Sequence, residues 1–232
     1  MQERSLKPDV VGAGVRTGRA PVREVVEALL AEDEWAVHAL CDEFAQRSGS
    51  RVAVFADLLQ VALREIAELW YRGSVGGAQE TSAALLVASA VDRLAPTPAR
   101  AAVQAGSRCL LILQPGERHT LGLRILSLAL EDEGWAADVV SGPDWSRCLA
   151  SLESRPLPRF VGLSAGHIHA RQGLAGAIRA ISALRLPVLV GGAAFNRSPE
   201  LWWQLGASAY GADARVGVVL ARRFAGRRPR GL

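Results

Sequence analysis

The stretch Gly116–Gly122 (GERHTLG) decides how this sequence folds, because it follows the apolar run Cys109–Leu113 (CLLIL) and leads into a helix-like segment, Leu121–Glu133. An apolar run, a glycine-containing loop and then helical periodicity together predict a strand, a loop and a helix. The loop after a strand of an open α/β sheet lies at the carboxyl edge, where such sheets bind ligands. The sequence therefore predicts that His119 stands at a ligand-binding edge.

The residues around His119 supply what a metal-ligating histidine requires. Glu117, two residues earlier, can accept a hydrogen bond from the far nitrogen of the imidazole and fix its orientation. Gly122, three residues later, has no side chain and lets a bulky ligand approach the backbone. The loop thus predicts an imidazole that coordinates a metal, with His119 as the ligand.

Strand and helix patterns alternate along residues 107–225. Short apolar runs predict the strands, and the amphipathic segments between them predict the helices. The predicted strands are Cys109–Leu113, Ala136–Val140, Phe160–Leu163, Pro187–Val190 and Ala207–Tyr210, and the predicted helices are Leu121–Glu133, Trp145–Ser154, Arg171–Leu184, Pro199–Leu205 and Asp213–Phe224. Five such repeats predict an α/β domain with a doubly wound, five-stranded parallel sheet.

The first part of the chain has helical periodicity only. Residues 21–95 contain four amphipathic segments with short connections, which predicts an antiparallel four-helix bundle. The first helix begins at Pro21, Asp33 is the predicted N-cap of the second, and Gly73 ends the third. Residues 1–20 are predicted to be disordered, residues 96–106 form a linker, and residues 226–232 form a basic tail.

The composition excludes several classes of protein. Half of the 232 residues are hydrophobic, as in packed globular proteins, and no apolar stretch has the length of a membrane helix. The N-terminus resembles no secretory signal, and three scattered cysteines form no C-x-x-C pair, so we expect a cytoplasmic protein without a disulfide scaffold or a zinc site. We expect the arginine-rich end to be solvated and, without a DNA-reading motif, no direct contact with nucleic acid.

Two further loops follow predicted strands at the same edge as His119. Ser164-Ala165-Gly166-His167-Ile168-His169 follows the third strand, and Gly191-Gly192 follows the fourth. Ser164 offers a small hydroxyl, and the paired glycines let the backbone come close to a ligand. Together the three loops predict a deep slot. His167 and His169 are either plain loop residues or functional ones, as contacts to amide groups of the ligand or as spare metal ligands.

Residues 107–225 resemble the cobalamin-binding α/β domain, a flavodoxin-like fold, through Glu117-x-His119-x-x-Gly122, Ser164 and Gly191-Gly192. The resemblance implies that His119 replaces the benzimidazole beneath cobalt, giving a base-off, His-on cobalamin, and that the displaced nucleotide tail enters the slot. It implies cofactor contacts for Glu117, Arg118, Thr120, Gly122, Ser164, Gly166, Gly191 and Gly192. Glu117 replaces the Asp usual in that family, and Leu123 stands where methyltransferase corrinoid proteins usually carry Lys.

Residues 22–95 resemble the helical cap that covers the cofactor's upper face. The segment Leu69–Thr81 is similar to the Trp-x-x-Gly…Glu-His segment of cobalamin photoreceptors of the CarH type. The resemblance implies that Trp70 packs over the upper ligand and that Glu80 lies in the cofactor site. Thr81 replaces the expected His, which argues against a second His ligand from that position and leaves the upper ligand undefined.

The resemblance implies a cobalamin-dependent light sensor rather than an enzyme. CarH-like proteins carry a DNA-binding domain that this sequence lacks, so the output would act through a separate effector or repressor protein, as in AerR-type antirepressors, or through a homo-oligomer. In the related photocobilin group the same unit also holds a bilin, so biliverdin is a further cofactor hypothesis. The alternatives are a corrinoid carrier subunit of a methyltransferase and a haem-, flavin- or bilin-binding sensor on the same scaffold.

Overall fold

The computed structural model describes residues 19–95, 107–150, 152, 157–167 and 171–226. Residues 1–18, most of the basic tail, the linker 96–106 and His169 lie outside the described residues. None of the described helices combines the length and the hydropathy that crossing a membrane would require. Cys41, Cys109 and Cys148 are buried, and no disulfide joins any two of them.

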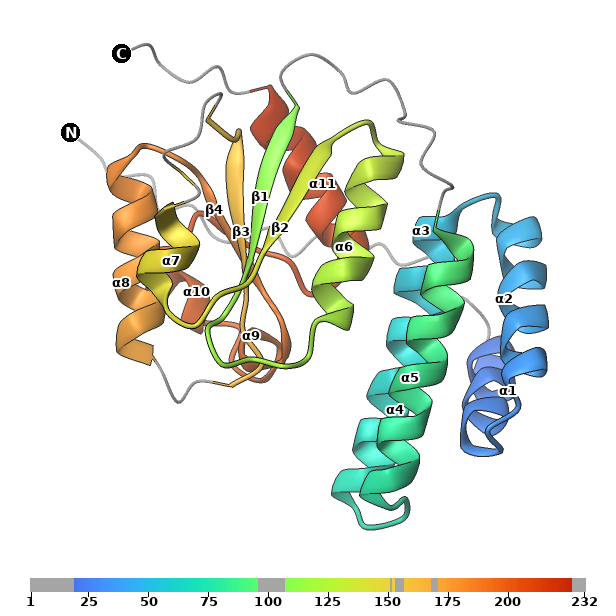
Figure 1. The fold of residues 1–232 in the computed structure, drawn as a ribbon. Helices are drawn as coiled ribbons and strands as arrows, with labels where there is room; N and C mark the ends of the chain where they lie inside the picture. The colour runs from blue at the N-terminus through green and yellow to red at the C-terminus, as the bar shows by residue number, and fades with distance from the viewer. Residues whose placement is uncertain (1–18, 96–106, 151, 153–156, 168–170, 227–232) are drawn as a thin grey trace, which may run out of the picture.

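The N-terminal part consists of helices, as predicted (Figure 1). Asp33 caps the second helix, where its carboxylate accepts a hydrogen bond from the backbone N–H of Ala36 at 2.9 Å. The turn between the last two helices contains Gly73, whose φ of +74° favours glycine. The bounds are α1 Arg19–Leu30, α2 Glu34–Ser48, α3 Arg51–Ala53, η1 Val54–Leu59, α4 Gln60–Tyr71 and α5 Gly77–Leu94.

Two details of this bundle differ from the prediction. Helix α1 begins at Arg19, so Arg19 and Ala20 are helical although they were assigned to the disordered segment. The predicted third helix, from about Val52 to Tyr71, is continuous in space but contains the π-helical segment η1 in its middle. Nearly every residue of η1 is buried, so neighbouring helices surround this segment on most sides. Apolar periodicity alone does not distinguish a π-helical turn from an α-helical one.

The α/β part contains a five-stranded, fully parallel sheet in the order β2-β1-β3-β4-β5, which confirms the predicted fold class. This order is that of flavodoxin-like doubly wound sheets, which bind ligands where the chain direction switches between β1 and β3. The bounds are β1 Arg108–Leu113, β2 Ala136–Val140, β3 Phe160–Ser164, β4 Val188–Gly191 and β5 Ala209–Tyr210.

Helices cover both faces of the sheet (Figure 1). Along β1, Cys109, Leu111 and Leu113 join the core on the bundle side, and Leu110 and Ile112 join the core on the other side. Helices α6 and α11 lie on the bundle side, and α7 and α8 on the opposite side. Their bounds are α6 Leu121–Asp132, α7 Trp145–Ala150, α8 Arg171–Ala183 and α11 Ala214–Ala225.

The segment after β4 differs from the prediction. Residues 193–195 were expected to form a loop, but helix α9 spans Ala193–Arg197 and begins directly after Gly192. The helix expected at Pro199–Leu205 is the shorter α10, Leu201–Gln204. Ala194 and Phe195 are buried beneath the sheet edge, so tertiary packing rather than periodicity fixes this short helix.

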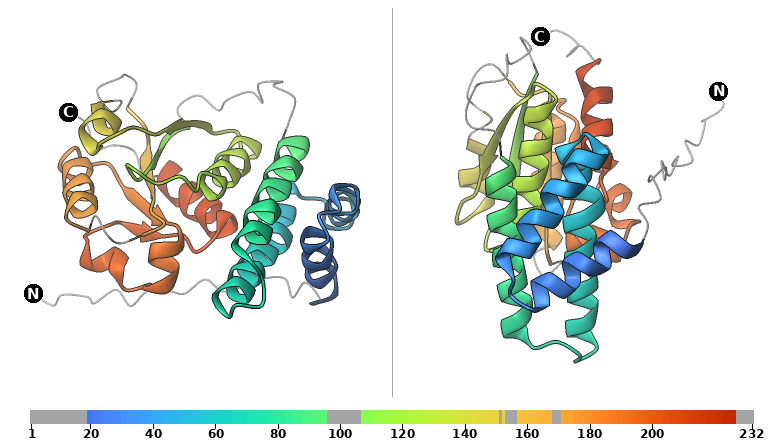
Figure 2. Two further views of the ribbon diagram at one scale, coloured as in Figure 1. Left: turned by 60° about the horizontal axis from the view of Figure 1, so that its bottom comes forward. Right: turned by 90° about the vertical axis from the view of Figure 1, so that its right-hand side faces the viewer.

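The bundle packs beside α6 and α11 and shares one apolar core with them. Ion pairs join the two parts: Arg51 with Asp132, Arg215 with Asp57, and Arg124 with Asp92 at 2.6 Å. Arg64 of α4 also donates to the carbonyl of Ala212, in the loop after β5, at 3.0 Å. Figure 2 shows α4 and α5 lying between the α/β part and the α1–α2 pair. One face of the α4–α5 hairpin therefore flanks the carboxyl edge of the sheet.

Candidate functional site

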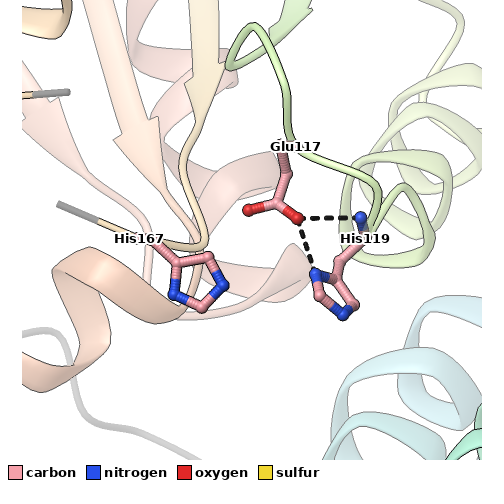
Figure 3. A group of neighbouring side chains, drawn as sticks. All are labelled: Glu117, His119 and His167. Atoms are coloured by element: carbon pink, nitrogen blue, oxygen red, sulfur yellow. Dashed lines mark hydrogen bonds and ion pairs between the residues drawn. The ribbon is translucent and has the colours of Figure 1, made fainter. Parts of the chain in front are cut away.

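The loop between β1 and α6 holds the His119 ring through Glu117 (Figure 3). One carboxylate oxygen of Glu117, Oε1, accepts three hydrogen bonds: from the backbone N–H groups of Arg118 at 2.8 Å and His119 at 2.9 Å, and from Nδ1 of the His119 ring at 2.6 Å. Because an ionised carboxylate only accepts hydrogen bonds, Nδ1 is the nitrogen that carries the proton. The lone pair of Nε2 is then the one available to a metal.

The same contacts keep Glu117 ionised. Burial by itself raises the pKa of this carboxyl, but the hydrogen bonds from the backbone and ring of His119 and from the backbone of Arg118 outweigh burial and hold the pKa below its ordinary value. An ionised carboxylate behind the ring increases the basicity of the distal nitrogen. The pair is therefore arranged for ligation through Nε2.

The side chains of Glu117 and His119 differ strongly in their exposure to solvent. The Glu117 side chain is 4% exposed, whereas the His119 side chain is 78% exposed. The backbone fixes the loop beneath them: Gln114 N–H donates to the Ser164 carbonyl at 2.9 Å, and Glu117 N–H donates to the Gln114 carbonyl at 3.0 Å. The loop therefore fixes the His119 imidazole and exposes it to solvent at the carboxyl edge of the sheet.

Gly166, on the loop after β3, makes room for Glu117. A Cβ atom at position 166 would stand 2.0 Å from Oε2 of Glu117. The sequence singled out Gly166 as a cofactor contact; the structure places it directly against the carboxylate that holds His119. The two loops are therefore parts of one site.

Ser164, Gly191 and Gly192 meet at the same edge, as the parallel register requires. Ser164 pairs with Gly191 across β3 and β4. A Cβ atom at Gly191 would lie 3.0 Å from the Gly211 carbonyl oxygen, and one at Gly192 would lie 2.5 Å from the Ala165 carbonyl oxygen. The close neighbours of these glycines are thus the chain's own backbone, and close approach of a ligand to them stays a prediction.

The other residues predicted around His119 face outward. Arg118, Thr120 and Gly122 are all exposed. Among the described residues, nothing outside the adjoining backbone lies within 4 Å of the position that a Cβ on Gly122 would take. The first turn of α6 beside His119 is therefore open to a bulky group.

Trp70 and Glu80 lie on the bundle, at the two sides of the turn that joins α4 to α5. The Trp70 side chain is exposed, with 53% of the residue accessible, and its Nε1 lies 3.7 Å from the position of a Cβ on Gly77. Glu80 is partly buried in the first turn of α5, and the hydroxyl of Thr81 donates to the Gly77 carbonyl at 2.9 Å. Contact of Trp70 and Glu80 with a cofactor stays a prediction.

Sequence reasoning missed two features of this edge. The Gln114 side chain is buried at the end of β1, and its Oε1 has no hydrogen-bond partner among the described residues. An open pocket of about 340 Å³ runs along the face of α4 that carries Arg64. Gln114 could have been noticed as a polar residue ending an apolar run. Nothing in the sequence indicated the pocket, which is lined by Val61, Arg64, Glu65, Glu68, Leu69 and Arg72.

Comparison with known proteins relates the helical part to one family and most of the chain to one further protein. Residues 22–95 match the sequence model of a family described as "B12 binding domain". A Rhodobacter capsulatus protein, described as an uncharacterized 20.5 kDa protein in the bchF–crtJ intergenic region, is 27% identical over 173 residues, which cover 72% of this chain and 90% of that protein.

One solved structure shows the same fold. The monomethylamine corrinoid protein of Methanosarcina barkeri superposes with a TM-score of 0.72 at 16% identity and covers 88% of this chain and 98% of its own. A cobalamin-binding protein of Desulfitobacterium hafniense DCB-2 has a TM-score of 0.47 at 19% identity over 88% of this chain and 98% of its own. The superposition on the corrinoid protein shows that the fold of this chain is the cobalamin-binding Rossmann-like fold, and residues 22–95 match the model of a B12 binding domain.

Proposed function

We propose that this protein binds a corrinoid through His119 at the carboxyl edge of the sheet. The observation that carries the proposal is the exposed imidazole whose Nδ1 is held by the buried carboxylate of Glu117. This arrangement orients the ring and leaves Nε2 for cobalt. The match of residues 22–95 to a B12 binding domain supports the choice of a corrinoid over haem or flavin as the ligand.

The residues at the edge fit such a group. A Cβ on Gly122 would meet none of the described residues beyond its own helix, so a bulky group can approach the first turn of α6 there. The unpartnered Oε1 of Gln114 can accept a hydrogen bond from an amide group, and corrinoids carry several. When bound, the corrinoid supplies the cobalt that carries an alkyl or other upper ligand, while this chain supplies ligation, orientation and shielding.

We infer that the bound corrinoid serves as a carrier of a cobalt-bound group for a partner protein. Support comes from the fold that the chain shares with a methylamine corrinoid protein. In this proposal the chain is not a complete enzyme. The partner is a protein that presents its substrate to the upper face of the corrinoid, beside the α4–α5 turn.

A light-responsive regulator is the second candidate. It is favoured by Glu117, which takes the place of the Asp usual in corrinoid proteins, and by Trp70, which is exposed at the tip of α4 rather than buried in the core. In this version light changes the upper ligand, and a separate effector or repressor protein responds. The comparisons bear on corrinoid binding and not on light or biliverdin, so both stay predictions.

One reconstitution experiment tests both candidates. We expect the full chain, mixed in the dark with hydroxocobalamin, methylcobalamin or adenosylcobalamin, to retain the cofactor through gel filtration with the absorption spectrum of a base-off, His-ligated corrinoid. A spectrum that changes with light more than free cofactor does would favour the regulator. A light-stable complex would favour the carrier, and failure to retain any of the three would contradict the proposal.

Glu117 gives a sharper test of the ligation geometry. Glu117→Gln keeps an oxygen for the backbone N–H groups but removes the charge that pairs with the ring, so we expect cobalamin affinity to fall about 10- to 100-fold. Equilibrium dialysis measures the change. Glu43→Gln, at an exposed glutamate of α2 that pairs with Arg47, is the matched control and should bind normally. Equal affinity for the two variants would remove Glu117 from the site.

A further inference from the structure

A second imidazole stands opposite His119. His167, on the loop after β3, has its ring centroid 6.2 Å from that of His119, with the planes at 71°. Both side chains are exposed, and they come from loops that follow adjacent strands (Figure 3). The two rings are therefore held near one another by the sheet.

The donor atoms of these two rings and of Glu117 form a compact group. One nitrogen of each ring and one carboxylate oxygen all lie within 4.8 Å of one another. Within this group, Nδ1 of His119 and Oε1 of Glu117 already lie 2.6 Å apart, so the ion would take the place of the proton that these two atoms share. In a tetrahedral site with bonds of about 2.1 Å, ligand atoms stand roughly 3.4 Å apart. The donor atoms therefore lie close enough for one ion once the exposed rings turn toward it.

We propose that the corrinoid-free protein binds a divalent first-row transition ion through Glu117, His119 and His167. Two imidazoles and one carboxylate form a donor set typical of Zn²⁺, with a fourth position open to water. Hard ions such as Mg²⁺ prefer oxygen ligands, so the same set discriminates against them. Gly166, directly before His167, lets the loop after β3 lie against Glu117, since a Cβ there would stand 2.0 Å from Oε2.

This site goes beyond corrinoid binding and does not depend on it. Ion and corrinoid would compete, because the ion would replace the hydrogen bond from Nδ1 of His119 to Glu117 that the corrinoid proposal requires. His167 is the residue that separates the two roles, because the corrinoid proposal needs only His119 as a cobalt ligand. A variant of His167 therefore tests the ion site alone.

The experiment titrates the corrinoid-free full chain with ZnCl₂ by isothermal calorimetry. We expect one strong site in the unsubstituted protein and a dissociation constant at least tenfold higher in His167→Ala and in His119→Ala. MgCl₂ should give no comparable heat. His38→Ala is the matched control, since His38 lies in the bundle beside Ser89 and Glu34 and should not affect the titration.

A variant with its own absorption signal tests whether position 167 binds the ion without relying on a measured affinity. His167→Cys would place a thiol at the same position, and a thiolate bound to Co²⁺ gives a sulfur-to-cobalt charge-transfer band. We expect CoCl₂ to produce this band in His167→Cys and only ligand-field absorption in the unsubstituted protein. Zn²⁺ binding unchanged in His167→Ala, an equal loss in His38→Ala, or no charge-transfer band in His167→Cys would each overturn the proposal.

Discussion

Replacing the imidazole of His119 with a methyl group, His119→Ala, should reduce cobalamin affinity by at least about 100-fold, because even partners behind a metal ligand are worth 10- to 100-fold. Any cofactor that still binds should keep its own benzimidazole on cobalt. The fold should not change, since 78% of the side chain is exposed and the ring packs in no core. Equilibrium dialysis gives the affinity, and the absorption spectrum gives the lower ligand.

The control for this variant is His38→Ala, at a histidine of the bundle whose side chain is mostly buried near Glu34. It should bind cobalamin normally with a His-ligated spectrum. If His119→Ala bound with unchanged affinity and spectrum, the ligand would have to be another group at this edge. His167 would then be the first to substitute, because its ring is the described imidazole next to that of His119.

The sequence predicts the sheet well because each strand is a short apolar run between turn residues. All five predicted strands are present, and the parallel arrangement follows from the helices between them. The expected start of the last strand, Ala207, is two residues too early, because only Ala209 and Tyr210 pair with β4 at the edge of the sheet. Periodicity also missed α9 and the π-helical segment η1, both of which depend on what surrounds them.

The candidate site likewise has one part that follows from local sequence and another that depends on tertiary structure. The Glu117–His119 pair could be predicted, because residues two apart in a tight loop can reach one another and the chemistry of a carboxylate behind an imidazole is general. The close contact between Gly166 and Glu117 could not be predicted, because it joins two loops whose spacing depends on the register of β1 with β3. The position of Trp70 relative to His119 likewise depends on how the bundle packs on α6 and α11.

Gly192→Ala should destabilise the protein by about 3 kcal/mol or more, from two causes. Gly192 has φ +96° and ψ 174°, a backbone conformation that is essentially restricted to glycine. Forcing another residue into it costs about 1–3 kcal/mol. The new Cβ would also stand 2.5 Å from the Ala165 carbonyl oxygen, and such overpacking costs about 1–3 kcal/mol more. Because the neighbour is backbone, it cannot swing aside. For a chain of this size the loss lowers the melting temperature by about 6–12 °C.

Two other glycines separate these causes. Gly206→Ala carries the strain of φ +82° without a neighbour within 4 Å, and Gly176→Ala in α8 has neither problem. We expect a loss of about 1 kcal/mol for Gly206→Ala and a small gain for Gly176→Ala. Denaturant unfolding measures all three. A Gly192→Ala protein as stable as Gly206→Ala but unable to bind cobalamin would show that position 192 is reserved for the ligand, whereas the crowding at Ala165 predicts that the fold itself requires glycine there.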